Sequence, residues 1–371
     1  MPILAPKCFT ENYLKEIQEN LKARDLGTLE KCILALELVG RLQQGGLNFI
    51  FKGGTSLLLH LPDPKRLSID VDIICLDGSK KLKEALEVIG KEPPFTHWEH
   101  QQHRDRDTPP TQHYQVYYTP ARTASRQPSI QIDVIQAENP YAEVIRKPLQ
   151  TTFIEPEVAI EIPTPSSSSL LGDKLAAFAP STIGYPYSYT NRSGETQENP
   201  MQVLKHLFDV GQLAAFTDNF GETIKTYTTI HAEQIRYRRL EVDLAACLDD
   251  TQEAAVGVSL VDSLRKAIAD VRQDFFRKGI VAIDSHLFSE RFDAVAYRTA
   301  AARSALVAEL IRHNQAEYNL SQFISQELDI PILKTAALNT PWDSLSKIKK
   351  TAPAAFAAWL EAQRLRTEAG L

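Results

Sequence analysis

The sequence predicts an α/β domain in the first half of the chain, followed by an α-helical domain. Short β-prone runs alternate with stretches of helical periodicity as far as Pro163. From Met201 onward the apolar residues recur almost wholly at helical spacing. The chain has 371 residues, a length that allows two domains at about 100 to 200 residues each. We therefore expect one domain at residues 1–163 and a second at residues 164–371.

Composition predicts a compact protein that stays in the cytoplasm. Hydrophobic residues make up 43% and charged residues 24%, as in ordinary globular proteins. The sequence contains neither an apolar run long enough to span a bilayer nor the apolar core of a signal peptide. Its four cysteines are scattered, so we expect neither a disulfide framework nor a zinc site. A net charge of -6 excludes a global basic field, so any RNA binding must come from a local patch.

The first predicted elements are a helix, a strand and a glycine turn. Apolar residues at helical spacing predict a helix over 29–42, which Gly45 and Gly46 end. The β-prone run 47–51 predicts a strand, and the turn 52–56 leads into an apolar helical stretch through His60.

Three further strands complete the predicted α/β domain. The β-branched run 69–76 predicts a strand, 80–89 a helix, and 114–119 and 129–135 two more strands. A proline- and serine-rich stretch over 155–169 indicates a crossover or linker, and 185–200 is predicted to be a loop between two helices.

Three acidic residues on the predicted strands suggest a metal site. Asp70 and Asp72 are two apart, and residues two apart on a strand point to the same side. Adjacent carboxylates repel each other unless a cation lies between them, and oxygen ligands suit Mg²⁺. Asp133 supplies a third carboxylate on another apolar strand. Three such groups can hold two metal ions for phosphoryl chemistry.

The turn before the first acidic pair suggests a phosphate site. Gly53 and Gly54 let backbone N–H groups approach an anion closely, and the following helix start adds its dipole. We expect this turn to hold triphosphate oxygens, with the hydroxyl of Thr55 or Ser56 as a further donor.

At these residues the sequence resembles the nucleotidyltransferase superfamily, which combines a glycine and serine turn, an Asp-x-Asp strand and a later third acid. More narrowly, 51–56 together with 66–72 is similar to the AbiEii/AbiGii group, the toxins of type IV toxin–antitoxin systems. Asp173-Lys174-Leu175, at the start of a predicted helix, resembles the group's lysine motif. Residues 205–210, which include Asp209, resemble a helix that follows that motif in the group. The resemblance implies a nucleotidyltransferase fold with a mixed sheet, followed by a helical domain that contributes Lys174 and Asp209 to the cleft.

The resemblance also implies an activity. It implies transfer of NMP from an NTP to an acceptor, usually RNA such as the tRNA 3′ end, with Mg²⁺ or Mn²⁺ as cofactor. Growth arrest would follow, and a separately encoded antitoxin would be the partner. Lys174 would contact the triphosphate, and Asp209 would position Lys174 or the acceptor. By the same resemblance the nucleotide-binding residues are Gly53, Gly54, Thr55, Ser56, Arg66, Ser68 and Lys174, and the metal ligands are Asp70, Asp72 and Asp133.

Several alternatives stay open at this point. His206 stands where the family commonly carries an acid, and 185–200 is a long insertion, so the role of Asp209 is open. Lys174 and Asp209 could instead form a structural ion pair between helices. The acceptor could be a protein or a small molecule, and a non-catalytic nucleotide-binding module is the remaining alternative. We interpret His97, His100 and His103 as solvated residues and not as zinc ligands.

Overall fold

The structure is a computed structural model that describes residues 2–101, 111–123, 126–191, 193–262, 271–288, 290–368 and 370. The chain forms two compact units. The first unit comprises Met1–Ser166 together with Ser285–Glu290, and the second comprises Ser167–Asp284 together with Arg291–Leu371.

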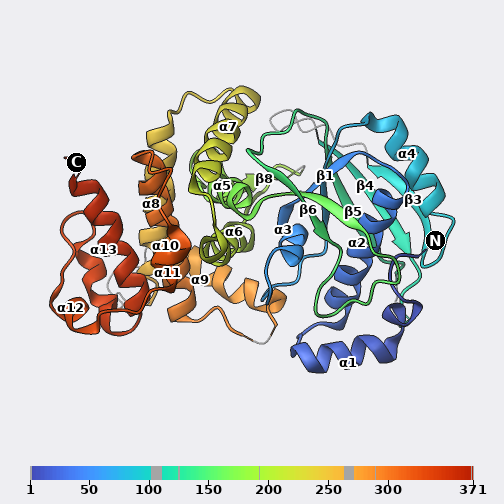
Figure 1. Ribbon diagram of the computed structural model, residues 1–371, viewed down its shortest axis with the longest axis horizontal. Coiled ribbons are helices and arrows are strands. Elements are labelled where there is room, and N and C mark those ends of the chain that lie inside the picture. The colour runs from blue at the N-terminus through green and yellow to red at the C-terminus, as the bar shows by residue number, and fades with distance from the viewer. Residues whose placement is uncertain are drawn as a thin grey trace. The chain divides into compact units, whose positions relative to one another are not determined.

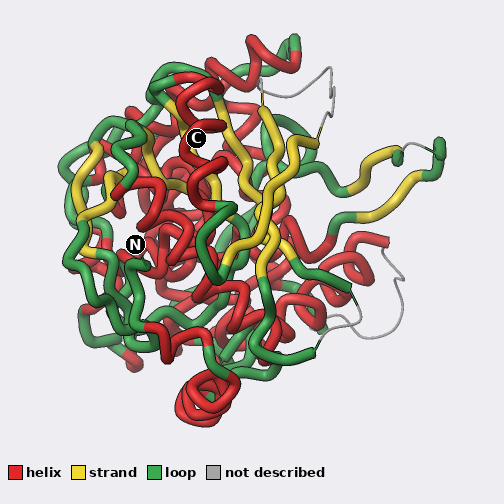
Figure 2. The backbone as a smooth tube through the Cα atoms, turned by 90° about the vertical axis from the view of Figure 1, so that its right-hand side faces the viewer, coloured by secondary structure: helices red, strands yellow, loops and turns green. Residues whose placement is uncertain are grey.

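A five-stranded mixed sheet is the centre of the first unit (Figures 1 and 2). Its strands are β1 (Phe49–Lys52), β2 (Val71–Cys75), β3 (Phe95–Gln101), β4 (Thr111–Tyr118) and β5 (Ser129–Ile135). Their order across the sheet is β1-β2-β5-β4-β3. The central pair β2 and β5 is parallel, and the other pairs are antiparallel. The predicted mixed α/β class is therefore confirmed.

Helices cover one face of this sheet. The helical elements of the first unit are η1 (Pro6–Phe9), α1 (Glu11–Leu21), α2 (Leu26–Gln44), α3 (Gly53–Ser56), η2 (Leu57–Leu59) and α4 (Gly78–Ile89). Alternate strand residues such as Phe51, Val71 and Ile132 are fully buried in one core with Leu36 of α2 and Leu86 of α4. Because strand residues alternate between faces, their neighbours in sequence point to the opposite face. A separate two-stranded ladder pairs β6 (Val144–Pro148) with β7 (Glu161–Pro165).

The second unit is helical apart from one short hairpin, among the residues that the structure describes. Its helices are α5 (Ser167–Ala177), α6 (Pro200–Leu213), η3 (Ala214–Phe216), α7 (Phe220–Arg238), α8 (Leu244–Ser259), α9 (Val271–Ile283), α10 (Ala294–Arg312), α11 (Leu320–Ser325), α12 (Ile330–Thr335), η5 (Asp343–Lys350) and α13 (Pro353–Glu368), with η4 (Asp284–His286) beginning at its edge. The predicted helical second half is confirmed. No described helix is long and apolar enough to cross a membrane.

Several features of the structure differ from the prediction. The stretch 155–169, predicted to be a crossover or linker, contains β7. The segment 185–200 was predicted to be a loop but contains a hairpin of β8 (Ser188–Thr190) and β9 (Thr196–Glu198). The second strand begins at Val71 and not at Ile69. Strand β3 was not predicted, because Phe95 is its one buried residue and the edge strand lacks apolar alternation. His97 and His100 lie on β3, whereas His103 lies outside the described residues.

A short segment from late in the chain belongs to the first unit. Within Ser285–Glu290, the His286 carbonyl accepts from Leu67 N at 2.9 Å, and Phe288 N donates to the Lys65 carbonyl at 3.1 Å. Leu287 and Phe288 are each 2% exposed. We call Ser285–Glu290 the return segment, and it fixes the chain just before Ser68.

Candidate active site

The Asp72 carboxylate lies directly against the backbone of Gly53. Gly53 has a φ of +78°, a conformation that favours glycine, and a Cβ built on it would lie 1.9 Å from Asp72 Oδ2. Lys52, immediately before it, is the antiparallel partner of Asp72 in β1 and β2. The glycine turn and the second acid of the Asp-x-Asp motif are therefore one packed unit.

The second glycine of the turn is covered by the Arg66-x-Ser68 motif. A Cβ on Gly54 would lie 2.7 Å from a terminal guanidinium nitrogen of Arg66 and 2.7 Å from Ser68 Oγ. Arg66 is 8% exposed and also donates to the Leu67 carbonyl at 3.3 Å. The turn is thus covered at Gly54 by Arg66 and Ser68, two of the residues predicted to bind the nucleotide.

Both hydroxyls of the turn are engaged with backbone carbonyls. Thr55 Oγ1 donates to the Asp70 carbonyl at 2.6 Å, and Ser56 Oγ donates to the Gly53 carbonyl at 2.9 Å. Both residues are fully buried. A hydroxyl has one hydrogen to donate, so in this conformation these side chains brace the turn. The direct contact of a Thr55 or Ser56 hydroxyl with a phosphate stays a prediction.

Two of the predicted metal ligands stand side by side on the face that α2 and α4 do not cover. Asp72 of β2 is the register partner of Asp133 of β5, in the parallel pair. Neighbouring strands lie about 4.8 Å apart. Each acid stands between fully buried neighbours, for example Val71 and Ile73, and so points to the opposite face. Asp70 precedes the strand, and its carbonyl is tied to Thr55.

Two polar side chains that were not predicted from the sequence contact the Asp133 carboxylate. His113 Nδ1 lies 2.7 Å from Asp133 Oδ1, and Gln131 Nε2 donates to the same oxygen at 2.8 Å. His113 faces Asp133 across the β4 and β5 ladder. The sequence carried a signal for Gln131, two residues before Asp133 on a strand. The sequence contained no such indication for His113. That residue lies opposite Asp133 because of the register of β4 against β5, which depends on the intervening loop.

Lys174 and Asp209 form a buried ion pair within the second unit. Lys174 Nζ on α5 lies 3.2 Å from Asp209 Oδ2 on α6, and the two side chains are 5% and 2% exposed. His206, one helical turn before Asp209, stacks on Tyr185 with ring centroids 5.1 Å apart. The structure therefore brings together the two residues named for the lysine motif and the later helix.

The acids are an oxygen donor set of the kind that Mg²⁺ and Mn²⁺ prefer. Among the described residues, no three His, Cys, Asp or Glu side chains gather closely enough to enclose a metal ion. That arrangement still suits Mg²⁺, which proteins commonly bind through one or two carboxylates while substrate phosphates and water complete the shell. Asp72 and Asp133, in register on one face, provide such a pair.

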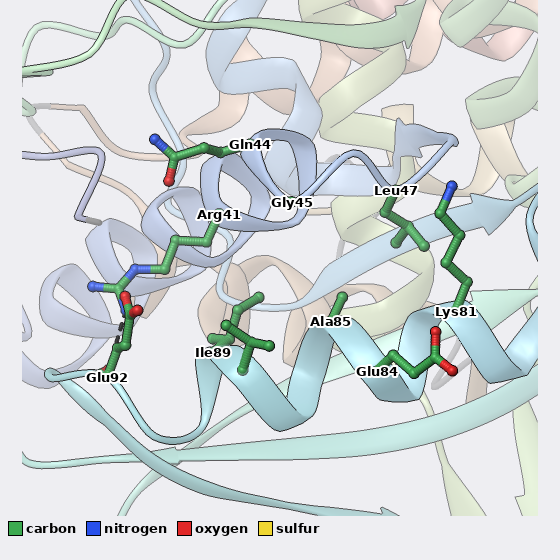
Figure 3. Close-up of a pocket in the computed structure, with 10 residues that line it drawn as sticks. Arg41, Gln44, Gly45, Leu47, Lys81, Glu84, Ala85, Ile89 and Glu92 are labelled. Carbon is green, nitrogen blue, oxygen red and sulfur yellow. Dashed lines mark hydrogen bonds and ion pairs between the residues drawn. The ribbon is translucent and has the colours of Figure 1, made fainter.

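A pocket in the first unit lies elsewhere, between α2 and α4 (Figure 3). Arg41 on its wall is already paired with the buried Glu37 at 2.6 Å and donates to the Pro93 carbonyl at 2.7 Å. Helices α2 and α4 pack on the opposite face of the sheet from Asp72, so this pocket is separate from the acids.

A sequence profile for the nucleotidyl transferase AbiEii toxin of type IV toxin–antitoxin systems matches residues 38–298. The match covers more than half of the 371 residues and includes every candidate site residue from Gly53 to Asp209.

Three solved structures are similar to the chain at low identity. The protein JHP933 from Helicobacter pylori is 16% identical, with 83% of this chain and 95% of that chain covered and a TM-score of 0.42. The nucleotidyltransferase toxin MenT4 from Mycobacterium tuberculosis is 13% identical, with 93% of this chain and 98% of that chain covered and a TM-score of 0.41. An antigenic nucleotidyltransferase-like protein from Paracoccidioides brasiliensis is 14% identical, with 67% of this chain and 95% of that chain covered and a TM-score of 0.33. No curated protein matches the chain. These structural similarities are weak, so the family of the chain is assigned from the sequence profile.

Proposed function

The chain belongs to the AbiEii nucleotidyl transferase toxin family of type IV toxin–antitoxin systems, and we propose that it transfers NMP from an NTP to the 3′ end of an RNA such as tRNA. It is a nucleotidyltransferase enzyme, and its family implies an antitoxin partner. The observation that carries the proposal is the contact of Asp72 with Gly53, which joins a phosphate-binding turn to a carboxylate in register with Asp133.

We assign the triphosphate to the backbone of the turn. The positive φ of Gly53 and the lack of a side chain at Gly54 let N–H groups face an anion. The Arg66 guanidinium beside Gly54 adds a positive charge that can balance phosphate oxygens. Ser68 beside it offers a hydroxyl.

We assign the divalent metal ion, Mg²⁺ or Mn²⁺, to Asp72 and Asp133, with Asp70 as a further ligand. When bound, the metal would lower the pKa of the attacking hydroxyl and neutralise charge on the leaving pyrophosphate. The RNA 3′-oxygen forms a bond to the α-phosphorus while the bond from that phosphorus to the bridging oxygen breaks. Pyrophosphate leaves with that oxygen, and the hydroxyl proton passes to a carboxylate of the site.

For the second unit, the proposal rests on the family resemblance. Lys174 is assigned to the triphosphate and Asp209 to holding the Lys174 ammonium, a role that their distance of 3.2 Å supports. An ammonium serves as a compact point charge for phosphate. We place the reaction in the cytoplasm, where NTPs and RNA are available.

The test is a labelling experiment with the purified chain. Each of the four α-labelled NTPs is incubated with total cellular RNA and Mg²⁺, and label in RNA, protein and low-mass products is separated. We expect label in RNA, equimolar pyrophosphate, and loss of both in Asp72→Asn. The matched control is Glu99→Gln, which changes an exposed carboxylate on the same sheet and should retain activity.

Two results would contradict parts of the proposal. Label in protein or in a small molecule would replace RNA as the acceptor. No label from any NTP, in a preparation that still binds NTP, would contradict transfer itself. Growth arrest on expression should likewise depend on Asp72, with Glu99→Gln as toxic as the wild-type chain.

A further inference from the structure

Among the residues that the structure describes, two side chains lie within hydrogen-bond distance of Asp133, and both contact the same oxygen. His113 Nδ1 lies 2.7 Å and Gln131 Nε2 2.8 Å from Oδ1. In the tautomer that makes this hydrogen bond, His113 carries a hydrogen on Nδ1 and donates it to the Asp133 carboxylate. Within the described part of the chain, both contacts are to Oδ1, so Oδ2 is the oxygen that we assign to a ligand.

The contact with His113 constrains the orientation of the Asp133 carboxylate. His113 and Asp133 are register partners on adjacent strands, and Gln131 stands on the same strand and face as Asp133. One donor therefore comes from across the ladder and the other from along the strand. Two donors at different angles hold a carboxylate in one rotamer more firmly than either donor alone.

From these contacts we infer that His113 is a positioning residue that, with Gln131, turns Asp133 Oδ2 toward the metal ion. The inference rests on the proposed function and adds two residues to its machinery. Outer hydrogen-bond partners orient the carboxylates and imidazoles that bind metals, and their loss commonly costs about 10- to 100-fold in metal affinity or activity.

A purely structural role makes a different prediction. The side chains of His113 and Asp133 are 21% and 25% exposed. A partly exposed contact between two side chains typically contributes little to stability. If the contact served only the fold, its removal would lower the melting temperature slightly and leave metal binding unchanged.

Two substitutions at His113 separate the donor from the ring. In His113→Asn the amide nitrogen is attached to Cγ, as Nδ1 is in histidine, so the donor is retained at the same reach. His113→Leu fills similar space without a donor. Gln131→Met removes the second donor and provides an independent variant should His113→Leu fail to fold. The matched control is Gln115→Ala, two residues from His113 on the same strand and face.

The first measurement is binding of Mn²⁺ in the presence of a non-hydrolysable NTP analogue, followed by the loss of the free Mn²⁺ electron paramagnetic resonance signal. The second is kcat and NTP KM in the labelling assay. We expect His113→Leu to lose about 10- to 100-fold in Mn²⁺ affinity or kcat, with the NTP KM nearly unchanged. Gln131→Met should show a loss in the same direction, and His113→Asn and Gln115→Ala should resemble the wild-type chain.

Wild-type Mn²⁺ affinity and kcat in His113→Leu would overturn the inference, as would a His113→Asn variant that is as impaired as His113→Leu. Neither result would affect the proposed function, since wild-type transfer and its loss in Asp72→Asn would stand. A wild-type chain that neither binds Mn²⁺ nor transfers label would instead refute the proposed function.

Discussion

At the scale of single residues, Gly53 and Gly46 share a backbone conformation but differ in surroundings. Their φ angles are +78° and +74°. A Cβ on Gly53 would collide with the Asp72 carboxylate, whereas a Cβ on Gly46 would meet nothing within 4 Å. Substitutions at the two positions therefore distinguish the free-energy cost of a positive φ from the cost of a steric clash with Asp72.

We predict that Gly53→Ala abolishes transfer, because the methyl group must displace the Asp72 carboxylate. Gly46→Ala bears only the conformational cost, about 1 to 2 kcal/mol, and should keep its activity. Melting temperatures and the labelling assay on both variants test this. Full activity in Gly53→Ala would show that the position of Asp72 against the turn is not required.

His60 gives the first unit a dependence on pH. It is 8% exposed, and its Nε2 lies 3.1 Å from Thr164 Oγ1. Burial, together with the smaller effect of the nearby Lys147 charge, lowers the pKa of His60 from 6.5 to about 3. Because the unfolded chain binds a proton near pH 6.5 and the folded chain does not, stability falls as pH decreases below about 6.5.

We predict that His60 alone removes about 2 kcal/mol from the free energy of unfolding between pH 7 and pH 5. His60→Gln cannot ionise, so it should lack this part of the loss. Native-state hydrogen exchange of sheet peptides in the first unit, at both pH values, measures the difference. Equal pH dependence in the two proteins would contradict the lowered pKa.

At the scale of elements, α5 and α6 are joined by the Lys174 and Asp209 pair. Removing one partner leaves the other charge buried without it, which commonly costs about 3 to 5 kcal/mol. Replacing both by apolar residues of similar size is often neutral or stabilising. The pair therefore allows a test that separates a fold role from a role in the reaction.

We predict that Asp209→Leu strongly destabilises the second unit and that Lys174→Met/Asp209→Leu regains stability. Transfer should stay low in the double variant, because the ammonium assigned to the triphosphate is gone. Circular dichroism melts and the labelling assay give the two readouts. Restored transfer in the double variant would make the pair purely structural.

The sequence predicted elements well where the periodicity was long or the apolar alternation strong. Helix α2 and strand β5 are examples: β5 alternates buried and partly exposed residues throughout. Edge strand β3 escaped prediction because its exposed histidines and glutamate carry no apolar alternation. Short hairpin β8 and β9 lies in a polar stretch with no buried residue to mark it.

For the candidate site, the sequence predicted local motifs but not the contacts between them. The glycine turn and Asp72 were both singled out, yet their contact depends on the antiparallel register of β1 and β2. His113 was missed for the same reason, since its register against Asp133 is a tertiary property. The ion pair of Lys174 with Asp209 was one of the alternatives predicted from the sequence. The role of the two residues in the reaction stays a prediction.

At the scale of the whole molecule, the chain passes between the two units three times. It leaves the first unit after Ser166, returns at Ser285 and leaves again after Glu290. The return segment places Phe288 in the hydrophobic core of the first unit, so residues 1–166 alone lack part of that core.

We predict that a 1–166 fragment is less stable than the first unit of the intact chain by at least about 3 kcal/mol, the usual cost of removing one large buried aromatic side chain. A synthetic peptide of residues 284–291 should raise its melting temperature. The same peptide with Leu287 and Phe288 replaced by serine is the control. The prediction would be contradicted by a fragment that melts at the same temperature as the first unit of the intact chain and whose melting temperature neither peptide changes.

The return segment also has a consequence for synthesis on the ribosome. From residue 166 to residue 290 the ribosome must add 124 residues, the difference of the two numbers, which takes about 6 to 25 seconds at about 5 to 20 residues per second. Until then the backbone at Lys65 and Leu67, beside the residues that enclose Gly54, lacks its partners. A nascent toxin is therefore expected to remain inactive until most of its chain has been translated.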